Sequence, residues 1–170
     1  MLCIIRNATI NDAESVLENT KNIREETDFL LSYPDEINFS VEEEEELLED
    51  KENSPCEIQI CALIDDRIIG LAGISAVGSK DKVKHRAEFG ISIEKAYYGK
   101  GIGTALTKAC IECAKTAGYR QLELEVVAEN KNAIALYKKF GFKEIGRNPR
   151  GFCSRYTGWQ ELISMLLELD

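Results

Sequence analysis

Three glycines that alternate with other residues lie within residues 97–104 of the chain. Gly99, Gly101 and Gly103 stand between a segment predicted to be a strand and one predicted to be a helix. Glycines at this place leave neighbouring backbone N–H groups uncovered, and the start of the helix adds the positive end of its dipole. Such a loop binds a phosphate or pyrophosphate without a basic side chain. The stretch therefore predicts an anion-binding loop, although glycines at helix starts also serve plain turns.

The remaining pattern mixes strands and helices. Strands are predicted at residues 2–7, 58–64, 69–77, 87–93, 122–126, 142–146 and 159–167. Helices are predicted at about residues 10–19, 41–51, 101–117 and 132–140. The second helix begins with a capping box of Ser40 and Glu43, and Asp65 and Asp66 form a tight turn between two strands. Residues 25–36 mix aromatic and acidic side chains, and we expect a short helix followed by a loop there.

Length and composition limit the class of protein. The 170 residues, of which 44% are hydrophobic, fit one domain over residues 1–170. A net charge of −9 argues against nonspecific nucleic-acid binding, which needs a basic face. The chain shows no membrane-length apolar run and no signal-peptide features at residues 1–6, so we expect a cytoplasmic protein without a membrane partner. The six cysteines are predicted to be free thiols without a metal, because His85 is the single imidazole.

A second motif lies downstream of the glycine loop. Residues 130–142 match the pattern Asn-x-x-Ala-x-x-Leu-Tyr-x-Lys-x-Gly-Phe, and residues 98–103 match Gln/Arg-x-x-Gly-x-Gly/Ala except that Tyr98 replaces Gln or Arg. In these two motifs, and in the order of its elements over about residues 56–167, the chain resembles the GNAT superfamily of acyl-CoA-dependent N-acetyltransferases. The resemblance implies an α/β fold of the α+β type, with a mixed, mostly antiparallel central sheet flanked by helices and with splayed central strands.

The resemblance also implies acetyl-CoA as the cofactor, with coenzyme A as product. Backbone N–H groups of residues 99–104 would hold the pyrophosphate, and the strand ending near Ile93 would pair with the pantetheine arm. Asn130 would hydrogen-bond the cofactor, and Tyr137 would direct its hydroxyl to the thioester sulfur. The cofactor-binding residues implied in this way are Ile91, Ser92, Ile93, Tyr98, Gly99, Lys100, Gly101, Ile102, Gly103, Thr104, Asn130, Ala133 and Tyr137.

Acetyl transfer to an amine needs a base, since an alkyl ammonium has a pKa of about 10.4 and only the neutral amine attacks a thioester. Glu88 is the first candidate, because it is expected to face the sheet opening, and Glu125 on the next strand is the second. Each is also compatible with a plain solvated carboxylate. Tyr137 is predicted to be catalytic through a hydrogen bond that strengthens as sulfur gains charge, or else to be a core aromatic.

The acceptor amine is not specified by the sequence. In the resembling superfamily, the first helices and the loop between the last two strands wall the acceptor site, here about residues 24–40 and 147–158. Acceptor-binding candidates from the first segment are Glu26, Asp28, Tyr33 and Glu36, which would suit a cationic amine of a small molecule or a protein. Three arginines of the second segment would instead select an acidic acceptor: Arg147, Arg150 and Arg155.

Two other classes of protein share features with this chain. A dinucleotide-dependent oxidoreductase would need a GxGxxG fingerprint at the start of a βαβ unit, whereas this chain has GxGxG after several antiparallel strands. A non-catalytic acyl-CoA-binding or regulatory module on the same scaffold is compatible with the sequence, because a fold does not fix an activity. A homodimer is also compatible with it.

Overall fold

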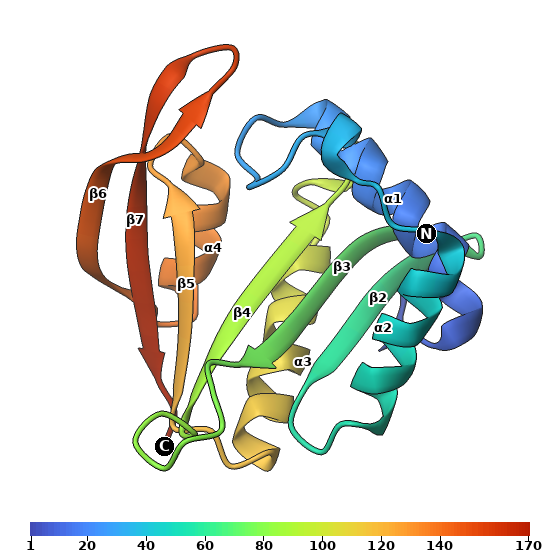
Figure 1. The fold of residues 1–170 in the computed structure, drawn as a ribbon, viewed down its shortest axis with the longest axis horizontal. Coiled ribbons are helices and arrows are strands. Elements are labelled where there is room, and N and C mark those ends of the chain that lie inside the picture. The colour runs from blue at the N-terminus through green and yellow to red at the C-terminus, as the bar shows by residue number, and fades with distance from the viewer.

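A seven-stranded sheet forms the centre of the computed structural model, which describes residues 1–170 (Figure 1). The strand order is β1-β2-β3-β4-β5-β7-β6, and all neighbours are antiparallel except β4 and β5. The predicted mixed, mostly antiparallel sheet is therefore confirmed. The strands are β1 (Ile4–Asn7), β2 (Ile58–Ile64), β3 (Arg67–Ala76), β4 (Arg86–Ile93), β5 (Gln121–Val127), β6 (Lys143–Ser154) and β7 (Gly158–Glu168).

Helices cover both faces of the sheet (Figure 1). Helices α1 (Ala13–Glu26) and α2 (Val41–Asn53) lie on one face, and α3 (Ile102–Thr116) and α4 (Lys131–Lys139) lie on the other. Strand β2 shows why both layers are needed. Its residues Ile60, Ala62 and Ile64 join the core with α3, whereas Cys61 and Leu63 join the core with α1 and α2. Apolar side chains on both faces of one strand require cover on both sides.

A helix cap and a hairpin turn form as the sequence predicts. The Ser40 hydroxyl accepts a hydrogen bond from the Glu43 N–H at 3.1 Å, and the Glu43 carboxylate accepts one from the Ser40 N–H at 2.8 Å. This capping box starts α2. Asp65 and Asp66 have φ values of 50° and 59°, so the β2–β3 hairpin closes through a two-residue turn in the left-handed region.

Three predicted boundaries were wrong. Helix α1 continues to Glu26, because the buried polar residue Asn19 interrupts its apolar stripe and hides the pattern that resumes at Ile23. Residues 27–36 hold no α-helix and contain only a 3₁₀ turn at Pro34–Glu36. Strand β6 continues to Ser154 through the predicted loop of residues 147–158; because it is an exposed edge strand, it lacks apolar alternation.

The two halves of the sheet separate between β4 and β5. Only three residue pairs join these strands, from Arg86 opposite Gln121 to Glu88 opposite Glu123. The side chains of Arg86 and Glu123 form an ion pair at this junction. Beyond Glu88 the strands diverge, as Figure 1 shows, so residues 89–93 of β4 leave the edge facing β5 unpaired. The predicted splayed central strands are thus present.

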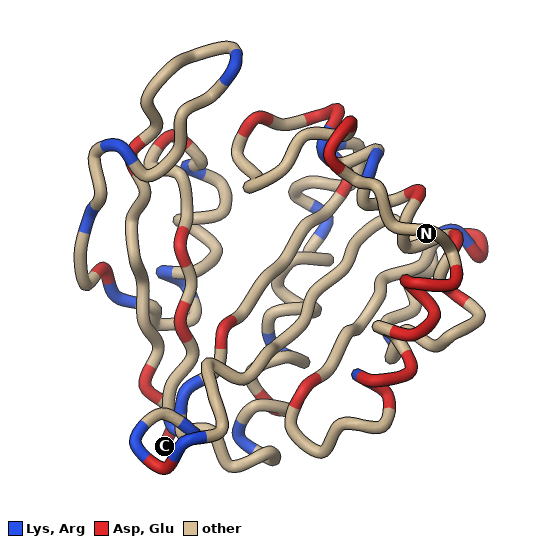
Figure 2. Tube along the Cα trace, viewed as in Figure 1, with Lys and Arg blue, Asp and Glu red and all other residues tan.

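Acidic side chains are concentrated on the N-terminal half of the molecule, above all along α2 (Figure 2). Helix α2 carries Glu42, Glu43 and Glu44 in its first turn, where the helix dipole favours negative charge. None of the helices combines the length and the apolar character that a membrane span requires.

Candidate active site

The glycine loop presents a row of free backbone donors. Gly99 and Gly101 have φ values of 73° and 79°, which place both in the left-handed region that glycine adopts without strain. The first helical hydrogen bond of α3 runs from the Ala105 N–H to the Gly101 carbonyl oxygen at 3.1 Å. The six N–H groups of residues 99–104 make no hydrogen bond within the chain. The start of α3 is therefore a ready anion site.

Close packing explains the third glycine. A Cβ atom on Gly103 would lie 3.3 Å from Ile93 Cδ1 and 3.3 Å from Leu136 Cδ2. The missing side chain lets the first turn of α3 approach the end of β4 and the side of α4. The loop is thus held directly beside the gap between β4 and β5.

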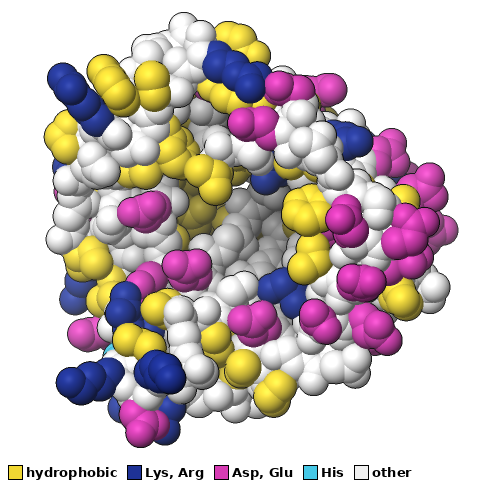
Figure 3. All heavy atoms as spheres, in the orientation of Figure 1, with side chains coloured by type: hydrophobic (Ala, Val, Ile, Leu, Met, Phe, Trp, Pro, Cys, Tyr) yellow, Lys and Arg dark blue, Asp and Glu magenta, His cyan; other side chains and the backbone are white.

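A cavity of about 690 Å³ occupies the split in the sheet. Its wall combines the unpaired part of β4, the glycine loop, the facing part of β5, the first turns of α4 and the end of α1 with the loop that follows. The space-filling view shows a hollow between the two halves of the molecule (Figure 3). The predicted site residues in its wall are Ile91, Ser92, Ile93, Tyr98, Gly99, Gly101, Ile102, Gly103, Thr104, Glu125, Asn130, Ala133 and Tyr137.

Helix α4 directs two of these residues at the cavity. Asn130 caps the helix, since its Oδ1 accepts a hydrogen bond from the Ala133 N–H at 3.3 Å. Tyr137 is buried, and its ring packs edge-on against Phe89 with 6.1 Å between ring centroids. Burial raises the pKa of Tyr137 to about 12. Its hydroxyl has no hydrogen-bond partner within the chain and is free to donate to a ligand.

The two candidate bases are both exposed, and they lie at different positions along the split. Glu88 occupies the last paired position of β4, is exposed, and does not line the cavity. Glu125 lies on β5 beyond the paired positions and lines the cavity, whose wall holds no other Asp, Glu, Lys, Arg or His. The Ser164 hydroxyl lies 3.4 Å from Glu125 Oε1 and orients the carboxylate. The geometry therefore favours Glu125.

The predicted acceptor residues lie outside the cavity wall and are bound elsewhere. Glu26 accepts a hydrogen bond from the Lys95 N–H at 2.7 Å, and Glu36 accepts one from the Tyr33 N–H at 2.8 Å. Asp28 accepts hydrogen bonds from Ser154 at 2.5 Å and from Gln160 at 3.4 Å. These carboxylates hold the backbone and the loops rather than forming an open acidic lip. Lys100 also stays out of the wall, with its ammonium 5.1 Å from the centre of the Tyr97 ring.

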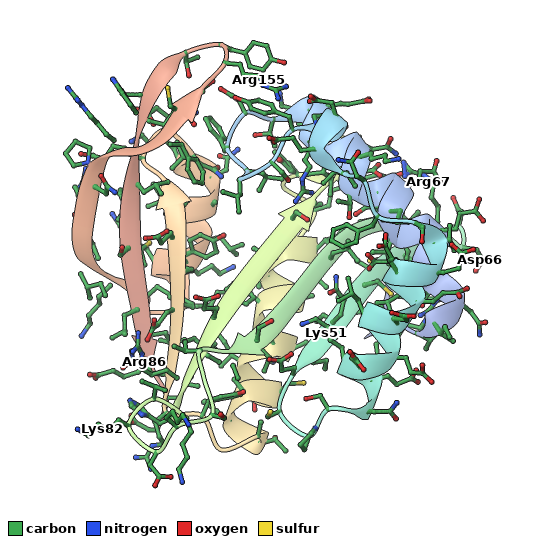
Figure 4. All side chains as sticks on the ribbon, viewed as in Figure 1. Lys51, Asp66, Arg67, Lys82, Arg86 and Arg155 are labelled. Atoms are coloured by element: carbon green, nitrogen blue, oxygen red, sulfur yellow. The ribbon has the colours of Figure 1, made fainter.

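The same contacts join the loop after α1 to the β6–β7 hairpin. Arg155 donates from its backbone to the Tyr33 hydroxyl at 2.7 Å, stacks its guanidinium on the Tyr33 ring, and pairs with Asp35 at 2.8 Å. Figure 4 shows Arg155 where the hairpin tip meets this loop. We call the contacts among Asp28, Tyr33, Asp35, Ser154 and Arg155 the latch. It connects the two halves of the molecule at the open end of the split.

Sequence reasoning missed most of the apolar wall. Helix α1 and the loop after it contribute Ile23, Thr27, Phe29 and Leu30 to the cavity. The other residues missed are Phe89, Gly90, Tyr97, Leu124, Val126, Asn132 and Leu136. The end of α1 was not predicted as helix, so no signal placed Ile23 there. The mixture of aromatic and acidic residues after it drew attention to carboxylates that lie outside the cavity wall.

A helix-flanked sheet that splits beside a helix with free N–H groups is an arrangement suited to a phosphate-bearing ligand between the central strands. The sequence profile of the Acetyltransferase (GNAT) family matches residues 20–142, and the chain belongs to that family. A solved structure of a GNAT-family acetyltransferase from Streptococcus pneumoniae is 30% identical, with a TM-score of 0.94 over 98% of this chain and 99% of that one.

Two further relatives are informative. The L-amino acid N-acetyltransferase AaaT of Escherichia coli is 32% identical over 93 residues, which are 54% of this chain and 57% of that protein. The chain thus matches little more than half of that relative. A Salmonella typhimurium protein, yncA, solved with its cofactor acetyl-CoA, has the same fold, with a TM-score of 0.85 at 21% identity over 99% of this chain and 94% of that one.

Proposed function

We propose that the protein is an acetyl-CoA-dependent N-acetyltransferase that moves an acetyl group to a primary amine within a ternary complex. The observation that carries the proposal is the row of six unbonded N–H groups of residues 99–104 beside the split between β4 and β5. Those donors suit a pyrophosphate, and the split has room for an extended thioester arm. Membership of the GNAT family supports the same ligand.

The unpaired edge of β4 supports the placement of the arm. Residues 89–93 end their pairing with β5 at Glu88, so their backbone groups on that side are open to an amide-bearing chain. Pantetheine carries two amides, and an extended chain adds to an open strand edge as a peptide does. Asn130 uses its Oδ1 in the helix cap and keeps its amide N–H₂ for the ligand.

Two side chains and the split itself contribute to the proposed chemistry. Glu125, directly or through water, takes a proton from the ammonium of the acceptor, and the neutral nitrogen attacks the acetyl carbonyl carbon. The carbon–nitrogen bond forms, the attacking nitrogen gives up a second proton to solvent, the carbon–sulfur bond breaks, and the sulfur leaves as a thiolate that is reprotonated from solvent. With a pKa of about 12, the Tyr137 phenol donates a hydrogen bond to the sulfur and keeps its own proton. The split holds amine and thioester together.

Replacement of the two carboxylates tests these roles. We expect Glu125→Gln to lower kcat by about 10²- to 10⁴-fold, the usual contribution of a general base. Glu88→Gln is the matched control, since Glu88 is exposed on the neighbouring strand outside the cavity. It should retain activity. Thiol release is measured with acetyl-CoA and an acceptor amine; if Glu88→Gln alone abolishes it, the assignment of the base is wrong.

The alternative is a non-catalytic acyl-CoA-binding module. Such a module would bind acetyl-CoA in a calorimeter and release no thiol with any amine. The free Tyr137 hydroxyl and the cavity-lining Glu125 favour an enzyme, because cofactor binding alone requires neither. The single domain over residues 1–170, the cytoplasmic location and the homodimer stay predictions, and analytical ultracentrifugation would test the last of these.

A further inference from the structure

We infer that the acceptor is a monoamine: one primary amine on an uncharged, apolar body, with neither a second cation nor a carboxylate. The inference rests on the proposed acetyltransferase function and names the acceptor class for that same cavity. It follows from which charged groups near the cavity are free to meet a substrate and which are already bound within the chain.

Only one carboxylate is available to a cation in the cavity. Glu125 is the only acidic residue in the wall. The carboxylates of the loop after α1 are engaged: Asp28 by Ser154 and Gln160, Asp35 by Arg155, and Glu36 by the backbone N–H of Tyr33. A diamine or polyamine would therefore bring a second ammonium into the cavity with no anionic partner, and burying an unpaired charge is costly.

The cavity wall offers no basic side chain to a carboxylate. It holds no Lys, Arg or His. Arg24, which is half-buried and follows the wall residue Ile23 in sequence, lies outside the wall and donates to the Ser32 hydroxyl at 2.7 Å and to the Thr20 carbonyl oxygen at 3.1 Å. Arg155 is held in the latch, and the Arg150 guanidinium lies over the Trp159 ring, 5.1 Å from its centroid. An amino acid acceptor would leave its carboxylate without a cationic partner.

Apolar side chains of α1 and of the loop after it form the cavity wall on the N-terminal side. Ile23 is buried on α1, and Phe29 and Leu30 follow in the loop that the latch fixes to the hairpin. Because the latch closes the open end of the split, this surface bounds the space left beside the thioester. Such a surface gains free energy by covering an alkyl or aryl group and gains none from a polar body.

A panel of matched amines tests the inference with the wild-type protein. Acetyl-CoA is turned over with 2-phenylethylamine, L-phenylalanine, hexylamine and 1,6-diaminohexane, and thiol release and the acetylated product are both measured. We expect kcat/KM for each monoamine to exceed that of its charged counterpart by at least about 100-fold, because the extra charge has no partner. Preference for the diamine or the amino acid would overturn the inference and leave the acetyltransferase proposal standing. No release with any amine would overturn both.

A pair of neighbouring variants sharpens the test. Leu30→Glu places a second carboxylate in the cavity wall, and the ratio of kcat/KM for the diamine to that for hexylamine should rise by at least about 10-fold. Leu31→Glu is the control, since Leu31 is 80% exposed and lies outside the wall; its ratio should not change. Thermal melts establish that both variants are folded, and an equal change of the ratio in both would contradict the placement of the acceptor.

Discussion

Replacing Gly101 by alanine separates the cost of backbone strain from the loss of anion binding. Gly101 has a φ of 79°, and a Cβ atom there would meet no atom of the protein within 4 Å. The folded state thus suffers only the conformational cost of an L-residue in the left-handed region, about 1–2 kcal/mol. For a chain of this length that cost lowers Tm by about 2–8 °C.

Binding should suffer separately from stability. The new methyl group stands beside the ligand space that Gly101 lines, and it would keep a pyrophosphate from its close approach to the backbone N–H groups of the loop. Loss of one hydrogen bond to a charged phosphate oxygen costs about 1.5–3 kcal/mol, which weakens coenzyme A binding by about 10- to 150-fold. S-acetylpantetheine, which lacks the pyrophosphate, should bind the variant as it binds the wild type.

Gly118→Ala is the matched control. Gly118 lies just beyond the C-terminal end of the same helix, with a φ of 87° and open space around its Cβ position, and it is remote from the cavity. Both variants should lose similar stability in thermal melts, and only Gly101→Ala should lose affinity in titration calorimetry. If the two variants bind coenzyme A within about threefold of each other, the free N–H groups are not the anion site.

Two further predictions follow from burial and charge. Tyr137→Phe should lower kcat by about 100-fold and leave acetyl-CoA affinity unchanged, because the hydroxyl acts on the departing sulfur. Since the pKa of Tyr137 is about 12, the wild-type pH profile should show no limb from it below about pH 10, and an alkaline limb removed by the variant would contradict this role. Asp12→Asn should lower the free energy of unfolding by about 1–3 kcal/mol at pH 7, because the Asp12 carboxylate accepts hydrogen bonds from the Arg6 guanidinium and the Thr9 N–H. The Arg6 guanidinium lowers the pKa of Asp12, so this stabilisation is present above the unfolded-state pKa and is lost as pH falls through the folded-state pKa. Urea melts of both proteins across acid pH would measure this, and a difference independent of pH would refute it.

Local signals made much of the fold predictable. The Ser40–Glu43 capping box, the Asp65–Asp66 turn and Gly101 each act within a few residues, so the sequence shows them directly. The cofactor side of the site was predictable for the same reason, because the donors of one loop and one helix start form it.

The acceptor side was not predictable in this way, because its determinants are long-range. Asp28 lies 126 residues from Ser154, and Asp35 lies 120 residues from Arg155, so nothing local in the sequence indicates that these side chains bind one another. The extended β6 was hidden for a related reason. As an exposed edge strand it carries polar residues on both faces, and its pairing with β7 supplies the order that periodicity does not show.

The sheet of this protein is incomplete by itself. Its two halves share one apolar core, but the strands β4 and β5 pair through only three residues each at one end of the split, and the latch joins the halves at the other end. A ligand that pairs with β4 and touches β5 would fill the place of the missing ladder and stabilise the folded state. Present at 100 times its Kd, such a ligand adds about 2.7 kcal/mol to the unfolding free energy. We therefore expect the chain without acetyl-CoA to be unfolded and proteolysed more easily than the chain that holds it.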